Sequence, residues 1–381
     1  MALSSSYERD QLTLGRKLLS FNWALLLFLC LVASVGFATL YSVGNGSLDP
    51  WAKRHAIRFL LGMSILFVVA LTDVRIWFKL AYPIYILAVV LLIAVAVVGT
   101  TGKGAERWID LRVIQLQPSE LMKVALILAL ARYFHKVPPE HMSGIGVLIF
   151  PLILTAIPVV LVLKQPDLGT ALLLIFEVVA LMFLAGVALR WFFAAGAMVA
   201  VAIPIGLSSL KDYQMERILT FINPERDPTG AGYHILQSKI AFGSGGMSGR
   251  GFLKGTQSQL NFLPEKQTDF IFTMFAEEFG FLGGLGLLGL YLLIIFYVLA
   301  IAVQVGHQFG RLLAMGICVM FFLYVFINAA MVMGLIPVVG VPMPLVSYGG
   351  TSMLTVMIGF GLIMSAHIHR NVDIPRYSSK I

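Results

Sequence analysis

The sequence predicts an all-α polytopic membrane protein, and three observations support this fold class. Of its 381 residues, 59% are hydrophobic and only 12% are charged, whereas soluble domains carry about 25% charged residues. The apolar runs are long enough to cross a hydrocarbon layer of about 30 Å as helices of roughly 20 residues. They lack the alternation that is typical of barrel strands. Neither end holds a soluble segment of domain size, so we expect one membrane domain over residues 1–381.

About ten membrane helices are expected. The first apolar run, 21–41, follows a polar, basic tail over 1–20 and lacks a convincing cleavage site, so we expect it to remain as the first span. The other expected spans are 56–72, 80–99, 118–134, 145–163, 168–188, 191–210, 270–303, 312–334 and 346–368. The one extended polar stretch, 211–267, is then a long loop between the seventh and eighth helices. An even number of spans returns the tail 369–381 to the side of the N-terminus.

The distribution of basic residues predicts that both termini are cytoplasmic. With that orientation the inner segments carry more lysine and arginine than the short outer loops, which is the usual bias. The 211–267 loop is then extracytoplasmic. Many basic residues still remain on the outer face, and two interpretations are open: ordinary contact with lipid headgroups, or a site for a polyanionic ligand presented from outside.

The long loop is expected to contain one short helix. Asp227 and Pro228 suit a helix start, and a helix over 229–242 could lie along the membrane interface. The glycine-rich stretch 243–251 has neither a preceding strand nor the Gly-Lys-Ser/Thr ending of a nucleotide-binding loop. We expect these glycines to let the backbone fold tightly over a ligand or over helix ends.

Asp269 is the candidate catalytic residue. It stands where the polar loop turns into the apolar run 270–303, and a carboxylate at the mouth of a membrane helix is costly enough to need a reason. One interpretation is that Asp269 is the N-cap of the eighth helix. The other is that it performs chemistry, and the two roles are compatible.

Two further polar groups lie within apolar runs. Glu120 and Lys123 are three residues apart and share one face of the fourth span, so they predict a buried ion pair, unless Lys123 instead reaches a ligand. Between Asn328 and Ser352, prolines and glycines interrupt the helix at membrane depth, which is tolerated where protein or a wet cavity supplies hydrogen bonds. Cys30 and Cys318 are read as small buried hydrophobes.

At these residues the chain resembles the shape, elongation, division and sporulation (SEDS) family, also called RodA/FtsW/SpoVE. The specific part of the resemblance is Asn328, Gly334-Leu-x-Pro337, Gly340 and Ser347-Tyr-Gly-Gly-Thr-Ser352. It extends over nearly the whole chain through Arg107-Trp108, Gln117-Pro-x-Glu-x-x-Lys123, Gln165-Pro-Asp-x-Gly-Thr170 and Thr268-Asp-Phe. The short N-terminus, residues 46–51 and the Arg107 region look more like the RodA branch. Many relatives have a histidine where this chain has Gln267, which puts any histidine-dependent step in doubt.

The resemblance implies a peptidoglycan glycosyltransferase that polymerises lipid II at the outer face of the bacterial cytoplasmic (inner) membrane. Asp269 would be the general base of an inverting transfer. The residues that would bind the undecaprenyl pyrophosphate-linked glycan are Arg58, Arg107, Glu120, Lys123, Lys266, Ser347 and Tyr348. The expected partners are a class B penicillin-binding protein, lipid II and membrane lipids, with no nucleic acid.

Three alternatives stay open on the sequence. A lipid II flippase also uses broken helices and buried charges, although it needs polar groups reachable from both faces. A division paralogue of the FtsW type and a noncatalytic scaffold are the others. No metal-ligand cluster is visible and no cofactor is assigned, but a divalent cation bridging pyrophosphate and carboxylate remains possible in principle.

Overall fold

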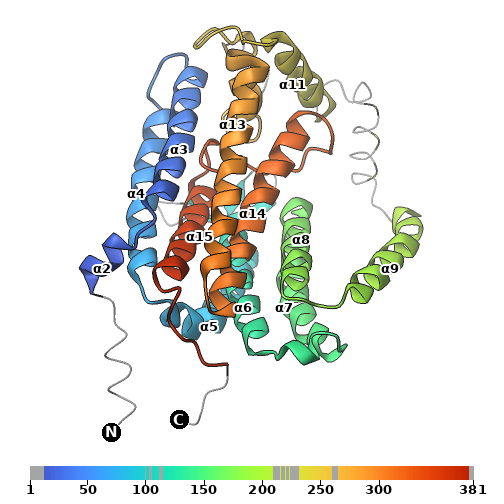
Figure 1. Cartoon of the computed structure of the whole chain (residues 1–381). Coiled ribbons are helices and arrows are strands. Elements are labelled where there is room, and N and C mark those ends of the chain that lie inside the picture. The colour runs from blue at the N-terminus through green and yellow to red at the C-terminus, as the bar shows by residue number, and fades with distance from the viewer. Residues whose placement is uncertain are drawn as a thin grey trace.

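The computed structural model describes residues 13–98, 100–102, 105–110, 115–208, 231–259 and 265–376, together with the isolated residues 215, 219 and 223. Its helices form an elongated bundle (Figure 1). The long helices are α3 (Trp23–Val43), α4 (Trp51–Leu71), α5 (Val74–Val98), α6 (Pro118–Lys136), α7 (Gly146–Lys164), α8 (Leu168–Leu184), α9 (Leu189–Ser208), α13 (Ile271–Gln304), α14 (Gln308–Val332) and α15 (Gly350–Ile368). The short ones are α2 (Leu14–Leu19), η1 (Pro139–His141), α11 (Ala231–Gly245) and α12 (Thr256–Gln259).

The ten long helices coincide with the ten expected spans. Within the described residues, seven of them are both long and apolar enough to cross a membrane, and α8 and α9 hold shorter apolar stretches. The remaining long helix, α6, carries Glu120, Lys123 and Arg132 within an otherwise apolar sequence. The chain is therefore a multi-pass membrane protein. Several boundaries differ from the expected ones: α4 begins at Trp51, α5 at Val74 and α15 at Gly350.

The expected single span over 270–303 is wrong in one respect, because the helix is broken at Gly280. There φ is 69° and ψ is −168°, so two helical segments meet at that residue. The glycine-rich loop closes the gap: Phe281 N donates to Gly246 O at 2.9 Å and Gly251 N donates to Glu278 O at 2.9 Å. The 24 residues after the break rise about 36 Å at 1.5 Å per residue, which is enough to cross the membrane.

The expected short helix in the long loop is present as α11, which packs against α13; its location along the membrane interface stays a prediction. Ser238 of α11 bonds to Thr273 Oγ1 at 2.9 Å and to Val332 O at 2.8 Å. The glycines that follow it fold over α13, as one of the two expectations stated. The suggested helix start at Asp227 and Pro228 lies outside the described residues.

One feature was not expected, a small antiparallel sheet after α5. Its strands are β1 (Thr100–Gly102), β2 (Ala105–Asp110) and β3 (Gln115–Leu116), in the order β1-β2-β3. The strands are too short and polar for the periodicity of the sequence to reveal them. This sheet places Arg107 and Trp108 of β2 close to the start of α6.

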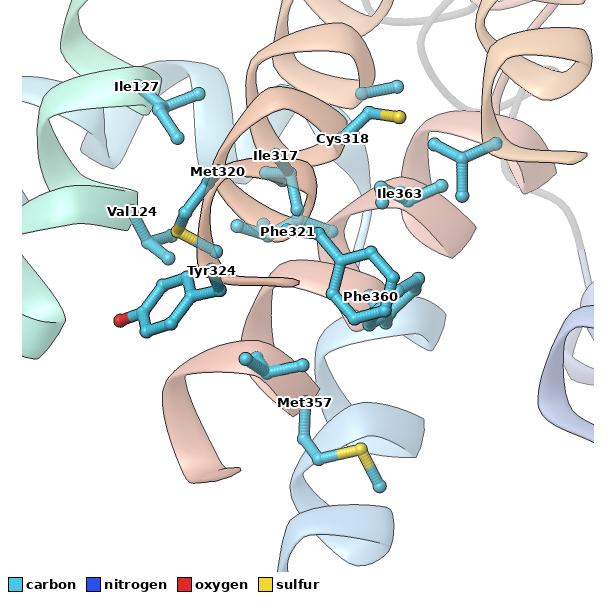
Figure 2. Close-up of a cluster of buried hydrophobic side chains, with 14 of the residues drawn as sticks. Val124, Ile127, Ile317, Cys318, Met320, Phe321, Tyr324, Met357, Phe360 and Ile363 are labelled. Atoms are coloured by element: carbon cyan, nitrogen blue, oxygen red, sulfur yellow. The ribbon is translucent and has the colours of Figure 1, made fainter. Parts of the chain in front are cut away.

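The hydrophobic core runs between α6, α14 and α15. Figure 2 shows Val124 and Ile127 of α6 facing the side chains of α14, with the Phe321 ring against Phe360 of α15. Those two rings meet edge to face with centroids 5.0 Å apart. Tyr324 lies beside this cluster with its hydroxyl group directed toward α6 (Figure 2). The apolar packing therefore holds α6 and α14 together at the height of Lys123 and Tyr324.

Candidate functional site

A cavity of about 220 Å³ brings together residues from distant parts of the sequence. Its wall is built by the β2 region, the starts of α6 and α8, the segment before α13, α14, and the loop before α15. The lining residues are Arg107, Trp108, Gln117, Glu120, Lys123, Asp167, Thr170, Leu173, Thr268, Asp269, Tyr324, Val339, Gly340, Val341, Pro342, Tyr348, Gly349, Thr351 and Ser352. Five of the eight sequence-predicted site residues lie in this wall: Arg107, Glu120, Lys123, Asp269 and Tyr348.

The main chain around Asp269 is fixed by polar contacts from two other segments, α14 and the loop before α15. Asn328 of α14 donates from Nδ2 to Asp269 O at 2.9 Å and to Val341 O at 2.7 Å. Its side chain thus ties the loop before α15 to the segment before α13. The carboxyl group faces Gly340, where an added Cβ would lie 3.5 Å from Asp269 Oδ2, so the glycine leaves space beside the carboxylate.

The loop before α15 supplies the second fixing point. Ser347 donates from Oγ to Thr268 O at 2.6 Å and accepts from Met343 N at 2.7 Å. Tyr348 N donates to Gln267 O at 2.8 Å. Since both bonds fall within two residues of Asp269, this loop sets the position of the carboxylate.

The interpretation of Asp269 as the N-cap of the eighth helix is wrong. Helix α13 begins at Ile271, and its N-cap is Phe270, whose side chain forms no capping hydrogen bond. The backbone around Phe270 instead turns through bonds such as Phe270 N to Glu265 O at 3.3 Å. The position of Asp269 at the cavity wall therefore has no explanation in helix capping.

The expected ion pair in the fourth span is confirmed, and a third side chain joins it. Lys123 Nζ lies 2.6 Å from Glu120 Oε1, and both side chains are almost fully buried. Tyr324 of α14 completes the group: it accepts from Lys123 Nζ and donates to Glu120 Oε2. Because a buried charge needs partners on every side, these three side chains form a single polar cluster in the cavity wall.

Arg107 is held mainly by the turn between α7 and α8. Its Nε donates to Gln165 O at 3.0 Å, and Nη1 lies 3.7 Å from Asp167 Oδ2. Asp167 also caps α8, since it accepts from Thr170 N at 3.2 Å and from Thr170 Oγ1 at 3.0 Å. The guanidinium group thus links the small sheet to the start of α8 while it lines the cavity.

Three of the predicted substrate-binding residues do not line the cavity. Ser347 is the loop anchor described above. Arg58 of α4 lies over the Tyr348 ring, 4.4 Å from its centroid. It therefore contacts a residue of the cavity wall without lining the cavity itself. Lys266 is 4% exposed and lies 5.8 Å from the Trp51 ring centroid. Burial lowers the pKa of Lys266 from its ordinary value.

Sequence reasoning missed four polar residues at or near this cavity: Tyr324, Asn328 as an anchor of Asp269, Asp167 and Glu177. Asn328 and Asp167 stood within quoted motifs but received no role. Glu177 was the clearest signal, because a carboxyl group in the middle of the apolar run 168–188 is as costly as Asp269. Tyr324 could not be singled out, since tyrosine is common in membrane helices.

The site can act on a molecule that has both an anionic part and an exchangeable proton. Lys123 and Arg107 are cations in its wall, and Asp269 is a carboxyl group that a bound ligand could reach. Within the part of the chain that the structure describes, no group of three or more His, Cys, Asp or Glu side chains could hold a metal ion. Glu120, Asp167 and Asp269 line one cavity, but Glu120 is bonded to Lys123 and Tyr324, and Asp167 is engaged by Thr170 and Arg107.

The fold and this site define a multi-pass membrane protein with a polar cavity built around a buried ion pair, and comparisons with known proteins identify its family. The model of the family FTSW_RODA_SPOVE, described as "Cell cycle protein", matches residues 16–372. The chain belongs to this family.

Among its relatives, peptidoglycan glycosyltransferase MrdB of Escherichia coli (strain K12) is 45% identical over 322 residues, which cover 84% of this chain and 86% of that protein. Peptidoglycan glycosyltransferase RodA of Treponema pallidum (strain Nichols) is 34% identical, with 91% and 97% covered. The crystal structure of rod shape determining protein RodA of Thermus thermophilus matches with a TM-score of 0.70 at 30% identity, over 93% of this chain and 98% of that one. A chain in the structure of a peptidoglycan synthase complex, reported as coordinating polymerization and crosslinking, matches with a TM-score of 0.81 at 33% identity, over 93% and 99%.

Proposed function

We propose that this protein is a peptidoglycan glycosyltransferase that polymerises lipid II into glycan strands during cell elongation. The observation that carries the proposal is the convergence of Asp269, Arg107 and the Glu120–Lys123 pair on one cavity. The activity is the one named for the relatives in the MrdB and RodA branch. Their reaction needs a base and an anion-binding wall in one place, and this cavity has both.

Asp269 is the general base in this proposal. The acceptor sugar hydroxyl attacks the anomeric carbon of the donor, its proton passes to a carboxylate oxygen of Asp269, and the C–O bond to the pyrophosphate breaks. Because the donor linkage is α and the product is β, one inverting displacement is enough and no covalent intermediate forms. A positioned base of this kind contributes about 10² to 10⁴ in rate.

The leaving group is an isoprenyl pyrophosphate, and its charge requires cations in the wall. Among the described residues, Lys123 and Arg107 are the cations that line the cavity. Lys123 has three N–H donors, of which Glu120 and Tyr324 receive two. The third is available to a phosphoryl oxygen, so the pair with Glu120 does not prevent Lys123 from binding the pyrophosphate.

The cavity opens, in this proposal, at the outer face of the bacterial cytoplasmic membrane, with both termini inside the cell. Helix α11 lies at the end of the bundle opposite α2 and the segment after α15 (Figure 1). A class B penicillin-binding protein is the proposed partner, by similarity to a chain of a peptidoglycan synthase complex. Lipid II supplied from the membrane is the proposed substrate.

The decisive experiment is the change Asp269→Asn, which keeps the size of the side chain and removes its ability to take a proton. Glycan polymer is measured from lipid II with purified protein and its penicillin-binding partner, whose transpeptidase is blocked. We expect a loss of about 10² or more in rate. The thermal unfolding midpoint should stay close to wild type, because Asp269 does not cap α13.

Asp373→Asn is the matched control, since Asp373 is exposed and lies after α15, away from the cavity. It should polymerise at the wild-type rate. Near wild-type polymerisation by the Asp269→Asn protein would rule out the base. A wild-type protein that moves lipid II across vesicles but forms no polymer would contradict the glycosyltransferase itself.

A further inference from the structure

Glu177 is a carboxyl group in the middle of a membrane helix without any hydrogen-bonding partner in the part of the chain described. It is 1% exposed, and neither of its carboxyl oxygens has a hydrogen bond. It lies ten residues beyond Asp167, the N-cap of α8, which corresponds to about 15 Å along the helix. Such a group is expensive at that depth and indicates a function.

The groups that face Glu177 belong to the polar cluster of the cavity wall. Helix α8 packs against α6, α7 and α14. Helix α6 contributes Lys123 and Glu120, whose charges act on Glu177, and α14 contributes Tyr324. Helix α7 carries no titratable side chain before Lys164 at its end, and Asp167 on α8 itself is engaged by Thr170 and Arg107.

The position of Glu177 differs from that of Glu120 in one respect. Glu120, Lys123 and Tyr324 line the cavity, whereas Glu177 does not. The Lys123 charge therefore acts on one carboxyl group that lines the cavity and on a second one, Glu177, that does not. Figure 2 shows the Tyr324 hydroxyl group directed toward α6, where it donates to Glu120.

The charges of Lys123, Glu120 and Glu177 can be arranged in two ways that have the same net charge. It contains one ammonium group and two carboxyl groups, and an uncompensated charge at this depth is strongly disfavoured. One carboxyl group must then hold a proton. In the observed arrangement Glu120 accepts from both Lys123 and Tyr324, so the proton belongs on Glu177. In the other arrangement the proton is on Glu120 and Lys123 pairs with Glu177.

We propose that Glu177 is a positioning residue that shares the Lys123 ammonium group with Glu120, so that Lys123 has one position at the cavity wall and one withdrawn from it. The exchange is balanced. Lys123 gives one N–H proton to Glu120 Oε1 and takes the proton of Glu177, so the ammonium group keeps its charge and Glu177 becomes the carboxylate.

In the glycosyl transfer proposed above, on which this inference rests, the first position binds the pyrophosphate of the donor. The second position lowers the positive potential of the wall and favours release of the isoprenyl pyrophosphate product. A ligand selects between two such states only by its differential affinity for them, and an anion prefers the first. Removing Glu177 leaves Lys123 in the binding position.

The test is Glu177→Leu, with Glu177→Gln as the second variant and Leu181→Met as the control. Leu181 is buried on the same helix, one turn farther along. Replacing an unpartnered buried carboxyl group by an apolar side chain should raise the thermal unfolding midpoint. With inorganic pyrophosphate as the probe, we expect tighter binding, seen as a larger ligand-induced rise of that midpoint, and a kcat about tenfold lower with a lower KM.

Glu177→Gln should show the same split of kcat and KM, since glutamine keeps the shape but cannot exchange a proton. The Leu181→Met protein should match wild type in all three measurements. In a Lys123→Met background, Glu177→Leu should have no further effect on pyrophosphate binding.

Wild-type kcat and KM in both Glu177 variants would overturn the proposal, and so would a lower unfolding midpoint of Glu177→Leu. The pyrophosphate measurement is made on the protein alone. If it follows the expectation while wild type forms no polymer, the proposed glycosyltransferase activity fails and the two-position lysine stands.

Discussion

At the scale of single residues, the polar groups of the cavity wall support one another across helices that are far apart in the sequence. Lys123 and Glu120 lie on α6 and Tyr324 on α14, and each bonds to the other two. Asn328, one turn beyond Tyr324, holds the main chain of Asp269. The spacing of Glu120 and Lys123 predicted their pairing, whereas no local pattern related either to position 324, because that contact depends on how α6 packs on α14.

The pair gives a prediction at this scale. Lys123→Met should leave Glu120 with no cation in the membrane and cost about 3–5 kcal/mol of stability. The double variant Glu120→Gln/Lys123→Met should recover folding, measured by purification yield and unfolding midpoint in detergent. We expect polymerisation to stay low in the double variant, because Lys123 also binds the donor. A double variant that folds and polymerises as wild type would assign Lys123 a structural role only.

At the scale of secondary-structure elements, α13 depends on a loop for its geometry. The break at Gly280 leaves backbone groups unpaired, and the glycine-rich loop supplies the bonds, with Arg250 N donating to Glu277 O at 3.0 Å. Glu277 in turn accepts from Thr256 N at 2.8 Å. The sequence predicted tight folding of these glycines over helix ends, but it could not predict a break inside an unbroken apolar run.

Gly249→Ala tests this arrangement. Gly249 has φ of +81°, and an added Cβ would lie 2.1 Å from Glu278 O, so backbone strain and a clash with the main chain should cost more than about 2 kcal/mol. Gly243→Ala is the matched control, because nothing lies within 4 Å of its added Cβ. We expect Gly249→Ala to lower the unfolding midpoint, whereas Gly243→Ala should not lower it. Equal midpoints would mean that the loop does not fill the break.

The turn between α13 and α14 gives a pH dependence. Burial, with smaller effects of the nearby His135, His369 and Arg311 charges, lowers the pKa of His307 from 6.5 to about 4. The folded state therefore binds fewer protons than the unfolded state between these values. The neutral His307 side chain therefore contributes about 3 kcal/mol to the free energy of unfolding. This contribution is complete above pH 6.5 and is lost as the pH falls toward 4.

His307→Asn should reduce this dependence. His307 Nδ1 accepts from Gly310 N at 2.9 Å as the N-cap of α14, and asparagine can provide the same cap without titrating. The measurement is the unfolding midpoint between pH 7.5 and pH 4.5 for both proteins. The wild-type midpoint should fall more steeply, and parallel curves would show that His307 does not contribute.

At the scale of the whole molecule, the chain is asymmetric between its two ends. Helix α11 and the glycine-rich loop lie at one end, and α2 and the segment after α15 lie at the other (Figure 1). The proposed function requires that the end with α11 face the side of the membrane from which the polymerase receives its substrate.

Topology can be measured directly. A reporter tag inserted at Met247, whose side chain is 65% exposed, should be accessible from outside intact cells, and a tag after the last residue should be accessible only after lysis. The reason is the excess of lysine and arginine in the inner segments. Accessibility of both tags from the same side would contradict the ten crossings and place Asp269 on the wrong face for lipid II.

The sequence by itself determined the fold class, nearly all the membrane helices, the pairing of Glu120 with Lys123 and the prominence of Asp269. Each of these follows from local composition or spacing, since a run of apolar residues fixes a helix and a charge within it needs a neighbour. Only the tertiary structure decided that Asp269 is no helix cap, that Ser347 and Asn328 hold its main chain, and that Arg58 and Lys266 lie outside the cavity. It also revealed that Glu177 is buried without a hydrogen-bonding partner in the part of the chain described. These outcomes depend on which helices pack together, and that is set by side-chain shape across elements far apart in the sequence rather than by any pattern along it.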